Sequence, residues 1–233
     1  MKFLEKVAEN KHIIIYNAGE LSNVTDELVA AVKWPKEVEL LAFCFKPFPT
    51  KGGYVRHNLK SDYVIRHLYG GKTSSLKPLG KAMKNSPIIA RAPKNAAEAL
   101  KVTIDTLGRD TSSKYNKSGP AYHRERKRYY DMIKKGEVKS VLIFKNERNV
   151  GIASLIDVPK IGGGKASTFT WSWFDKRLPK SEYEDVRYKA TKWVLDNSQP
   201  FMASVNFDYN KESQKADSCL GLKPYRINFA RKK

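Results

Sequence analysis

Residues 205–223, VNFDYNKESQKADSCLGLK, contain the pattern that decides the fold. It predicts the end of a strand, a helix that begins after Asn210 and ends at Gly221, and then a last strand, PYRINFA. Asn is a favoured N-cap because its side chain accepts a hydrogen bond from a backbone N–H of the first turn. Gly readily adopts the positive φ that ends many helices. By itself this capped helix is as consistent with a structural role as with a functional one.

The elements that precede this stretch follow a regular order. Residues 88–108 predict a strand and a helix, and Asn95 followed by Glu98 is a variant of the capping box. Residues 140–158, SVLIFKNERNVGIASLIDV, predict a hairpin, and in residues 167–174 polar side chains alternate with aromatic ones, as in a strand with one apolar face.

This order of elements resembles the GNAT superfamily (GCN5-related N-acetyltransferases) over residues 88 to about 230. The Leu-Gly-Phe ending of the family has its counterpart in Leu220, Gly221 and Leu222. The resemblance implies an α/β (α+β) fold, in which a mixed, mostly antiparallel central sheet is flanked by helices. It also implies an enzyme that transfers an acyl group to an amine from acetyl-CoA or another acyl-CoA.

The loop that binds the CoA pyrophosphate in the family differs here. The family pattern places two small residues, usually Gly, before a helix, whereas residues 176–183 are KRLPKSEY and contain no Gly. Ser181 with Glu184 predicts a capping box, and the N-terminus of a helix suits an anion. The resemblance therefore implies either a divergent loop, in which Arg177, Lys180 and Ser181 compensate for the glycines, or a lost cofactor site.

Further cofactor contacts and catalytic groups are implied by the same resemblance. Asn210 matches the family's Asn, and Trp173 lies on the fourth strand, beside which the pantetheine arm binds. The family often uses a Tyr seven residues after its Asn as the acid, and that position is Asp217. Because an ordinary Asp is ionised at neutral pH, either burial raises the pKa of Asp217, Tyr209 serves instead, or the thiolate leaves unaided. Asp175 is the candidate base for the amine, although a plain loop carboxylate explains it equally simply.

Length and composition limit the architecture and the compartment. We predict an N-terminal α/β extension at residues 1–86 and a GNAT-like domain at residues 87–233; the alternative is that the N-terminal segment belongs to the same sheet. In the extension, Ser22 and Asn23 are cap candidates for a helix between two strands. No apolar run is long enough for a membrane helix, and the N-terminus lacks the apolar region of a signal peptide. The two Cys lie in apolar runs, which suits buried free thiols. We therefore expect a cytoplasmic protein. The Cys and His spacing predicts no metal site.

The net charge of +20 indicates a polyanionic partner. Aromatic residues lie between the basic residues of the Gly- and Pro-rich segment 46–86, a combination that suits phosphate contact and base stacking. The alternative is a solvated linker with a short amphipathic helix at residues 61–69. A basic helix is predicted at residues 121–136. The candidate nucleic-acid contacts are Lys51, Arg56, Lys60, Arg66, Lys72, Arg124, Arg126 and Arg128.

These observations give three hypotheses. The first is an acyl-CoA-dependent N-acyltransferase that modifies an amine of DNA or RNA, for which DNA-modifying members of the superfamily are a precedent. The second is a nucleic-acid-binding protein that keeps the scaffold without the chemistry. The third is an acetyltransferase for a protein or polyamine, which the charge disfavours because a cationic acceptor is repelled. The sequence does not indicate the oligomeric state.

Overall fold

The structure is a computed structural model, and two compact units divide the chain. It describes residues 4–9, 12–32, 34–45, 63–109, 120–159 and 164–231. The first unit comprises Met1–Gly71 and Ala203–Lys233, and the second comprises Lys72–Met202. Each unit is described by itself below.

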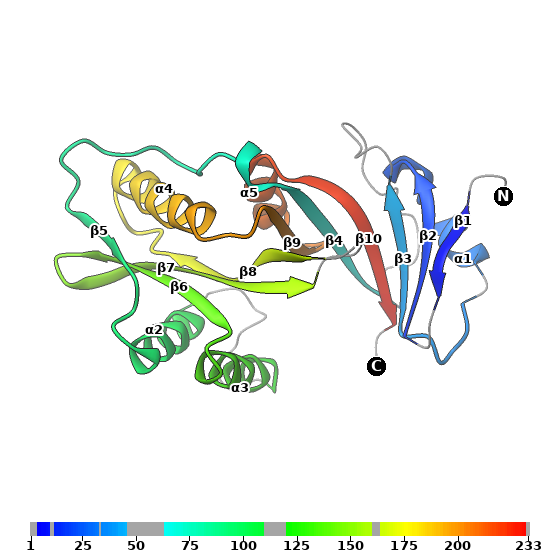
Figure 1. Ribbon diagram of the computed structural model, residues 1–233, viewed down its shortest axis with the longest axis horizontal. Coiled ribbons are helices and arrows are strands. Elements are labelled where there is room, and N and C mark those ends of the chain that lie inside the picture. Colours follow the sequence, from blue (N-terminus) through cyan, green and yellow to red (C-terminus); the bar gives the residue numbers. More distant parts are fainter. Residues whose placement is uncertain are drawn as a thin grey trace. The chain divides into compact units, whose positions relative to one another are not determined.

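The first unit is built on a mixed sheet (Figure 1). Its strands follow the order β1-β2-β3-β10-β4-β9, in which β2 and β3 run parallel while β1–β2, β3–β10 and β10–β4 are antiparallel. The strands are β1 (Glu5–Glu9), β2 (Ile13–Gly19), β3 (Leu40–Phe45), β4 (Tyr63–Lys72), β9 (Phe201–Phe207) and β10 (Lys223–Arg231), and the helices are the 3-10 helix η1 (Leu21–Asn23), α1 (Asp26–Ala31) and α5 (Lys211–Leu220).

The division between the units differs from the boundary that we predicted at residues 86 and 87. Strand β10, from the C-terminal end of the chain, pairs with β3 on one side and with β4 on the other. Side chains from both ends of the chain, including Phe43, Ile65 and Phe229, therefore share one buried core. The N-terminal segment completes the sheet that carries β10 and is not a separate extension.

Two local predictions in the first unit are wrong. The alternative of an amphipathic helix at residues 61–69 fails, because residues from Tyr63 onward form β4, whose hydrogen-bonding partner β10 lies far away in the sequence. Helix α1 begins after Thr25, whose side chain accepts a hydrogen bond from the N–H of Leu28 at 3.2 Å. The cap candidates Ser22 and Asn23 lie in η1 instead.

The second unit contains an antiparallel sheet with helices on both faces. Its strands follow the order β8-β7-β6-β5, with α4 on one face and α2 and α3 on the other (Figure 1). Buried side chains such as Leu107, Tyr129 and Ile152 join α2 and α3 to the sheet. The elements are η2 (Thr73–Ser75), β5 (Ile88–Arg91), α2 (Ala96–Arg109), α3 (Pro120–Lys134), β6 (Val138–Lys145), β7 (Arg148–Pro159), β8 (Lys165–Phe174) and α4 (Lys180–Asp196).

Two local features of the second unit, the start of α2 and the β6–β7 hairpin, are those that the sequence predicted. The side chain of Asn95 accepts a hydrogen bond from the N–H of Glu98 at 2.9 Å and caps α2, as predicted. The predicted hairpin is β6–β7, and its tight turn places Asn146 and Glu147 at positive φ. The predicted fold class, a mixed and mostly antiparallel sheet flanked by helices, is confirmed.

Three further observations concern the described residues only. No helix among them is both long enough and apolar enough to cross a membrane. No group of three or more His, Cys, Asp or Glu side chains among them could hold a metal ion. Cys44 is half-buried and Cys219 is exposed, so the predicted burial of both thiols is wrong for Cys219, which lies on the outer side of α5.

Candidate functional site

Helix α5 has the two ends that the sequence predicts. The side chain of Asn210 accepts a hydrogen bond from the N–H of Ser213 at 3.2 Å. Gly221 has a φ of 97°, and its N–H donates to the carbonyl of Ser218 while that of Leu222 donates to the carbonyl of Asp217. This pair of hydrogen bonds is the Schellman arrangement, which requires the left-handed conformation at the Gly.

A buried polar cluster joins α5 to β9. Asp217 is 5% exposed, and Ser204 and Asn206 beside it are 6% and 7% exposed. The side-chain amide of Asn206 donates a hydrogen bond to the carboxylate of Asp217. Burial raises the pKa of Asp217 to about 6, although hydrogen bonds from Ser204 and Asn206 favour the charged form. Burial, together with the negative charges of Asp217 and Asp208, raises the pKa of Tyr69 to about 12.

Asp217 therefore meets the condition that the sequence set for an acid at this position. With a pKa of about 6, a fraction of the carboxyl groups holds a proton near neutral pH. Perturbed pKa values of this kind are frequent at functional sites, although buried structural networks also produce them. The role of Asp217 as an acid stays a prediction.

The turn between β9 and α5 is held by a second set of hydrogen bonds. The N–H of Asp208 donates to the carbonyl of Ile65 at 2.9 Å, and Oδ1 of Asp208 lies 2.8 Å from Nε2 of His67. The amide of Gln214 donates to the carbonyls of Phe207 and Asp208 at 2.9 and 3.0 Å. These contacts link β4, β9 and α5. No signal in the sequence predicted those of Asp208, because Ile65 and His67 lie far from it in the chain, and the shorter-range contacts of Gln214 were missed as well.

Tyr209, the alternative acid, lies on this turn. Its side chain is 66% exposed and its ring stacks on that of Phe207. Partial burial raises the pKa of Tyr209, and the charge of Arg66 acts in the opposite direction. The phenol is therefore protonated at neutral pH and able to donate.

Asp175 has an environment that does not suit a general base. It is 2% exposed and accepts hydrogen bonds from the backbone N–H and the Nε of Arg177, at 3.1 and 2.9 Å, and from Arg148. The hydrogen bond from the Arg177 side chain lowers the pKa of Asp175 to about 2, despite the opposing effect of burial. Such a carboxylate is a weak proton acceptor, and Arg177, a predicted cofactor contact, serves here to neutralise it.

The N-terminus of α4 differs from the predicted capping box. The helix begins at Lys180 after Pro179, and no side chain caps it. Ser181 lies within the first turn instead of preceding it, because Pro179 is the N-cap and its carbonyl accepts the first helical hydrogen bond, from the N–H of Tyr183 at 2.9 Å. Glu182, the acid of the first turn, is paired with Lys145 at 2.7 Å. The uncapped N–H groups and the exposed Lys180 fit a phosphate, even though the loop lacks glycines.

Trp173, the remaining predicted cofactor contact, packs inside the second unit. It lies against the hydrophobic cluster that contains Leu107 and Trp171, and the guanidinium of Arg109 lies 5.6 Å from its ring centre. Its side chain therefore supports α2, and any contact with a pantetheine arm on β8 would come from the backbone.

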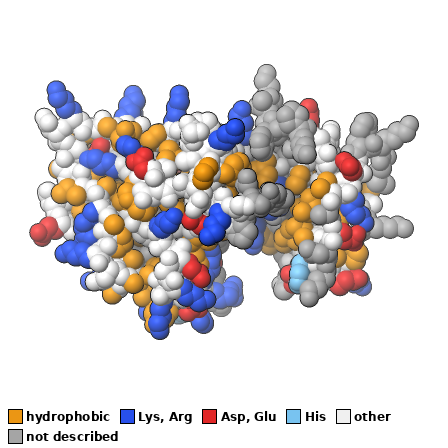
Figure 2. Space-filling model, in the orientation of Figure 1, with side chains coloured by type: hydrophobic (Ala, Val, Ile, Leu, Met, Phe, Trp, Pro, Cys, Tyr) orange, Lys and Arg blue, Asp and Glu red, His pale blue; other side chains and the backbone are white. Residues whose placement is uncertain are grey.

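The predicted nucleic-acid contacts fall into three groups. Lys51, Arg56 and Lys60 lie outside the described residues. Arg66 and Lys72 lie on β4, and both are exposed. Arg124, Arg126 and Arg128 are exposed on α3, where Arg128 pairs with Glu125 at 3.1 Å. Figure 2 shows Lys and Arg side chains spread over the visible surface.

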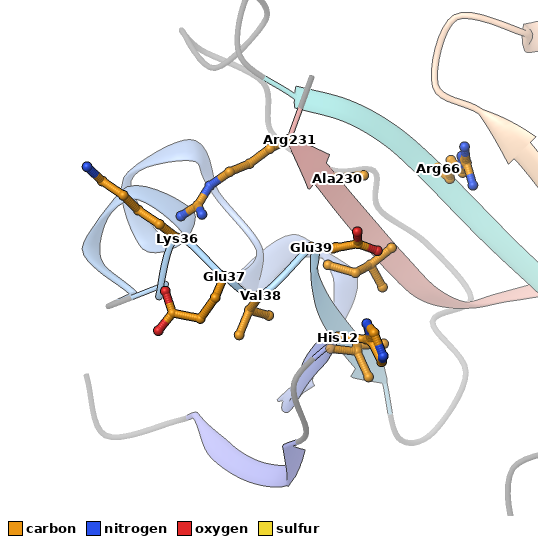
Figure 3. A pocket seen from close by; sticks show the side chains of 10 residues that line it. His12, Lys36, Glu37, Val38, Glu39, Arg66, Ala230 and Arg231 are labelled. Atoms are coloured by element: carbon orange, nitrogen blue, oxygen red, sulfur yellow. The ribbon is translucent and has the colours of Figure 1, made fainter. Parts of the chain in front are cut away.

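A hollow of about 610 Å³ opens in the first unit beside the segment that leads into β3, next to the start of β2 and the end of β10 (Figure 3). Its wall mixes charges of both signs, because Lys36 and Arg66 line it together with Glu37 and Glu39. Arg231 is engaged there, since its guanidinium stacks 4.4 Å from the ring centre of Trp34. Among the predicted site residues that the structure describes, only Arg66 lines this hollow, and the acidic side chains beside it do not suit a phosphate.

Comparison with known proteins concerns the fold. No protein-family model matches the sequence, and no curated protein matches it. A conserved protein of unknown function from Staphylococcus epidermidis has a similar structure, with a TM-score of 0.52 and 11% identity over 98% of this chain and 94% of that one. This likeness concerns the fold. The elements of this chain from β5 to β10 follow the order that the resemblance implied.

Two solved structures with GNAT descriptions are also similar at lower scores. A GCN5-related N-acetyltransferase from Kribbella flavida is 10% identical, with a TM-score of 0.44 and coverage of 100% of this chain and 91% of that one. A tandem GNAT protein from the clavulanic acid biosynthesis pathway is 12% identical, with a TM-score of 0.45 and coverage of 84% and 65%. At these identities the likeness concerns the fold alone.

The raised pKa of Asp217 has a measurable consequence for stability. A carboxyl whose pKa is higher in the folded than in the unfolded state stabilises the protein most at low pH, and that contribution is lost as pH rises through about 6. The ordinary value is 3.8, so the loss amounts to about 3 kcal/mol. We expect the stability of the wild type relative to Asp217→Asn to fall by this amount between about pH 4 and pH 8.

Urea unfolding of both proteins across this pH range measures the difference. Asp175→Asn is the control: the pKa of Asp175 is about 2, so its difference from the wild type stays flat over the same range. A constant difference for Asp217→Asn would show that Asp217 is ionised in the folded protein throughout.

Proposed function

We propose that this protein is an acyl-CoA-dependent N-acyltransferase whose acceptor amine is carried by nucleic acid. The observation that carries the proposal is α5, a helix capped by Asn210 and ended by Gly221, with a buried carboxyl of raised pKa at Asp217. In the GNAT-like order of elements these are the positions of the cofactor asparagine and of the acid. The net charge of +20 supports a polyanionic acceptor.

Different residues would carry the separate steps of the acyl transfer. A bound acyl-CoA supplies the thioester carbonyl, which the amine attacks so that a C–N bond forms and the C–S bond breaks. Lys180 and the free N–H groups at the start of α4 would hold the pyrophosphate. Asp217, in its protonated form, or the phenol of Tyr209 would give a proton to the departing sulfur. The low pKa of Asp175 leaves the amine proton to another acceptor, which water can provide.

The second candidate function is a binding protein that keeps the scaffold without the reaction. The absence of glycine between residues 176 and 183, together with the pairing of Arg177 with Asp175, favours it. The two functions differ in one property, since only the first requires affinity for acyl-CoA.

Calorimetric titration with acetyl-CoA tests the proposal, after a nuclease digestion and a high-salt wash that remove bound polyanion. Asn210→Ala is expected to reduce the affinity about tenfold, because a single lost hydrogen bond to a ligand is worth about 1 kcal/mol or somewhat more. Asn95→Ala is the matched control, since Asn95 caps α2 in the same way and its loss has a similar effect on helix stability.

Each result has a clear meaning. Saturable binding that Asn210→Ala weakens and Asn95→Ala does not supports the acyltransferase. Equal weakening by both variants would attribute the effect to lost helix stability, and an absence of binding to the wild type would favour the scaffold without chemistry.

A further inference from the structure

One strand of the first unit presents apolar side chains to solvent. Side chains alternate along β9, so those of Ser204 and Asn206 face α5 while those of Val205 and Phe207 face the opposite side of the sheet. Val205 is 50% exposed, and Tyr209, just beyond the strand, is 66% exposed. Tyr209 is in ring contact with Phe207, which makes this end of the strand a candidate binding surface.

The aromatic rings of this surface form an ordered stack with a cation. The rings of Phe207 and Tyr209 are nearly parallel, with centres 5.3 Å apart and an angle of 14° between their planes. The guanidinium of Arg66, on β4, lies 5.2 Å from the centre of the Phe207 ring. We call Arg66, Phe207 and Tyr209 the stacking platform. Three planar groups, one of them charged, follow one another across two strands.

The backbone below the platform is fixed. Gln214 donates hydrogen bonds to the carbonyls of Phe207 and Asp208, and Asp208 is bonded both to the carbonyl of Ile65 and to His67. The N–H of Asn210 closes the turn on the carbonyl of Phe207 at 3.0 Å. A rigid support lowers the entropy that is lost when a ligand binds, so the platform is preorganised.

We propose that the stacking platform binds an unpaired base of single-stranded nucleic acid on the open face of Tyr209. A sheet that offers aromatic rings and an Arg is a recurring way to stack unpaired bases, because every base has a π-face. Arg66 provides a cation for an adjoining phosphate. The ammonium of Lys211, whose side chain is 72% exposed, lies 3.6 Å from Oδ1 of Asp208 and is a second cation beside the platform. Bases within a duplex are covered by their neighbours, so the platform selects single strands.

This inference rests on the proposed acceptor class, nucleic acid. It adds that the stacking platform is the binding surface and that the bound nucleic acid is single-stranded. It does not depend on the acyl transfer itself. The platform adjoins Asn210, so a base stacked on Tyr209 would lie on the same turn as the predicted cofactor asparagine.

Fluorescence anisotropy with labelled oligonucleotides tests the inference. Tyr209→Ala is expected to weaken binding of a single-stranded oligothymidylate about tenfold, within the range of about 1–3 kcal/mol measured for stacking of one base. Tyr209→Phe should keep the affinity, because the ring remains. Tyr130→Ala is the matched control, since Tyr130 is 46% exposed beside Lys134 on α3 in the second unit and should leave the affinity unchanged.

Two further probes identify what the platform recognises. An abasic strand of equal charge should bind the wild type and Tyr209→Ala equally, because it has no base to stack. Arg66→Ala should weaken the oligothymidylate and the abasic strand alike and reduce the salt dependence of both, because it removes a phosphate contact.

Several outcomes would overturn the inference. These are unchanged oligothymidylate affinity in Tyr209→Ala, an equal loss in Tyr130→Ala, and an equal loss for the abasic strand. Weaker acetyl-CoA binding by Tyr209→Ala with unchanged oligonucleotide binding would assign the platform to the adenine of the cofactor. A change of oligomeric state in sedimentation, with no change in oligonucleotide affinity, would assign it to a second copy of the chain. Lack of acetyl-CoA binding by the wild type would contradict the proposed reaction and leave this inference standing.

Discussion

Gly80→Ala is expected to lower the free energy of unfolding by about 3–5 kcal/mol, from backbone strain and steric overlap together. Gly80 has a φ of +79°, a conformation that is unfavourable for residues with a Cβ. A Cβ at this position would also overlap the backbone carbonyl of Glu184 in α4. Neither the helix backbone nor the chain at Gly80 can move aside without separating the two segments.

Gly136→Ala is the matched control for this prediction. Gly136 has a φ of +70°, and a Cβ there would meet no atom within 4 Å. This variant should lose only the strain of the left-handed conformation, about 1–2 kcal/mol. Denaturant unfolding of the two variants separates strain from overlap, and equal losses would show that α4 does not approach Gly80 as closely as the structure places it.

Asp185→Ala is expected to have the second large effect, a loss of about 3–4 kcal/mol. The carboxylate is fully buried in α4 and accepts hydrogen bonds from the N–H of Met83 at 2.9 Å, from Ser86 and from Lys189 at 2.9 Å. Burial raises the pKa of Asp185, but these three donors outweigh burial and lower it overall. Removing the carboxylate leaves the N–H of Met83 and the hydroxyl of Ser86, both half-buried, without their acceptor.

Asp196→Ala, on the same helix, provides the comparison. Asp196 is also paired with a Lys, at 2.8 Å from Lys192, but its side chain is 56% exposed. An exposed pair of this kind contributes less than about 1 kcal/mol. In chemical denaturation, the loss in free energy of unfolding should therefore be about 3 kcal/mol larger for Asp185→Ala than for Asp196→Ala. Similar losses would mean that Asp185 is hydrated.

The features of the fold that the sequence predicted correctly depend on residues close together in the chain. Both ends of α5 and the cap of α2 by Asn95 were predicted correctly, because a cap needs only one side chain and an N–H a few residues away. The predicted capping box at Ser181 failed for an equally local reason, since Pro179 starts the helix earlier. The positions of Asn210 and Asp217 on one helix follow from the same local rules.

Tertiary structure decided what these residues can do. The pKa of Asp217 depends on burial against Ser204 and Asn206. That of Asp175 depends chiefly on Arg177, only two residues along the chain, and to a smaller extent on Arg148 from a neighbouring strand. The stack on Tyr209 needs Arg66 from β4, a strand that the sequence did not predict because its pairing partner β10 lies at the other end of the chain. Sequence alone determined which side chains are present, how α2 begins, and how α5 begins and ends. Only the pairing of distant strands determined which of those side chains are buried, charged or brought together, because burial and electrostatic interactions depend on distance in space and not on separation along the chain.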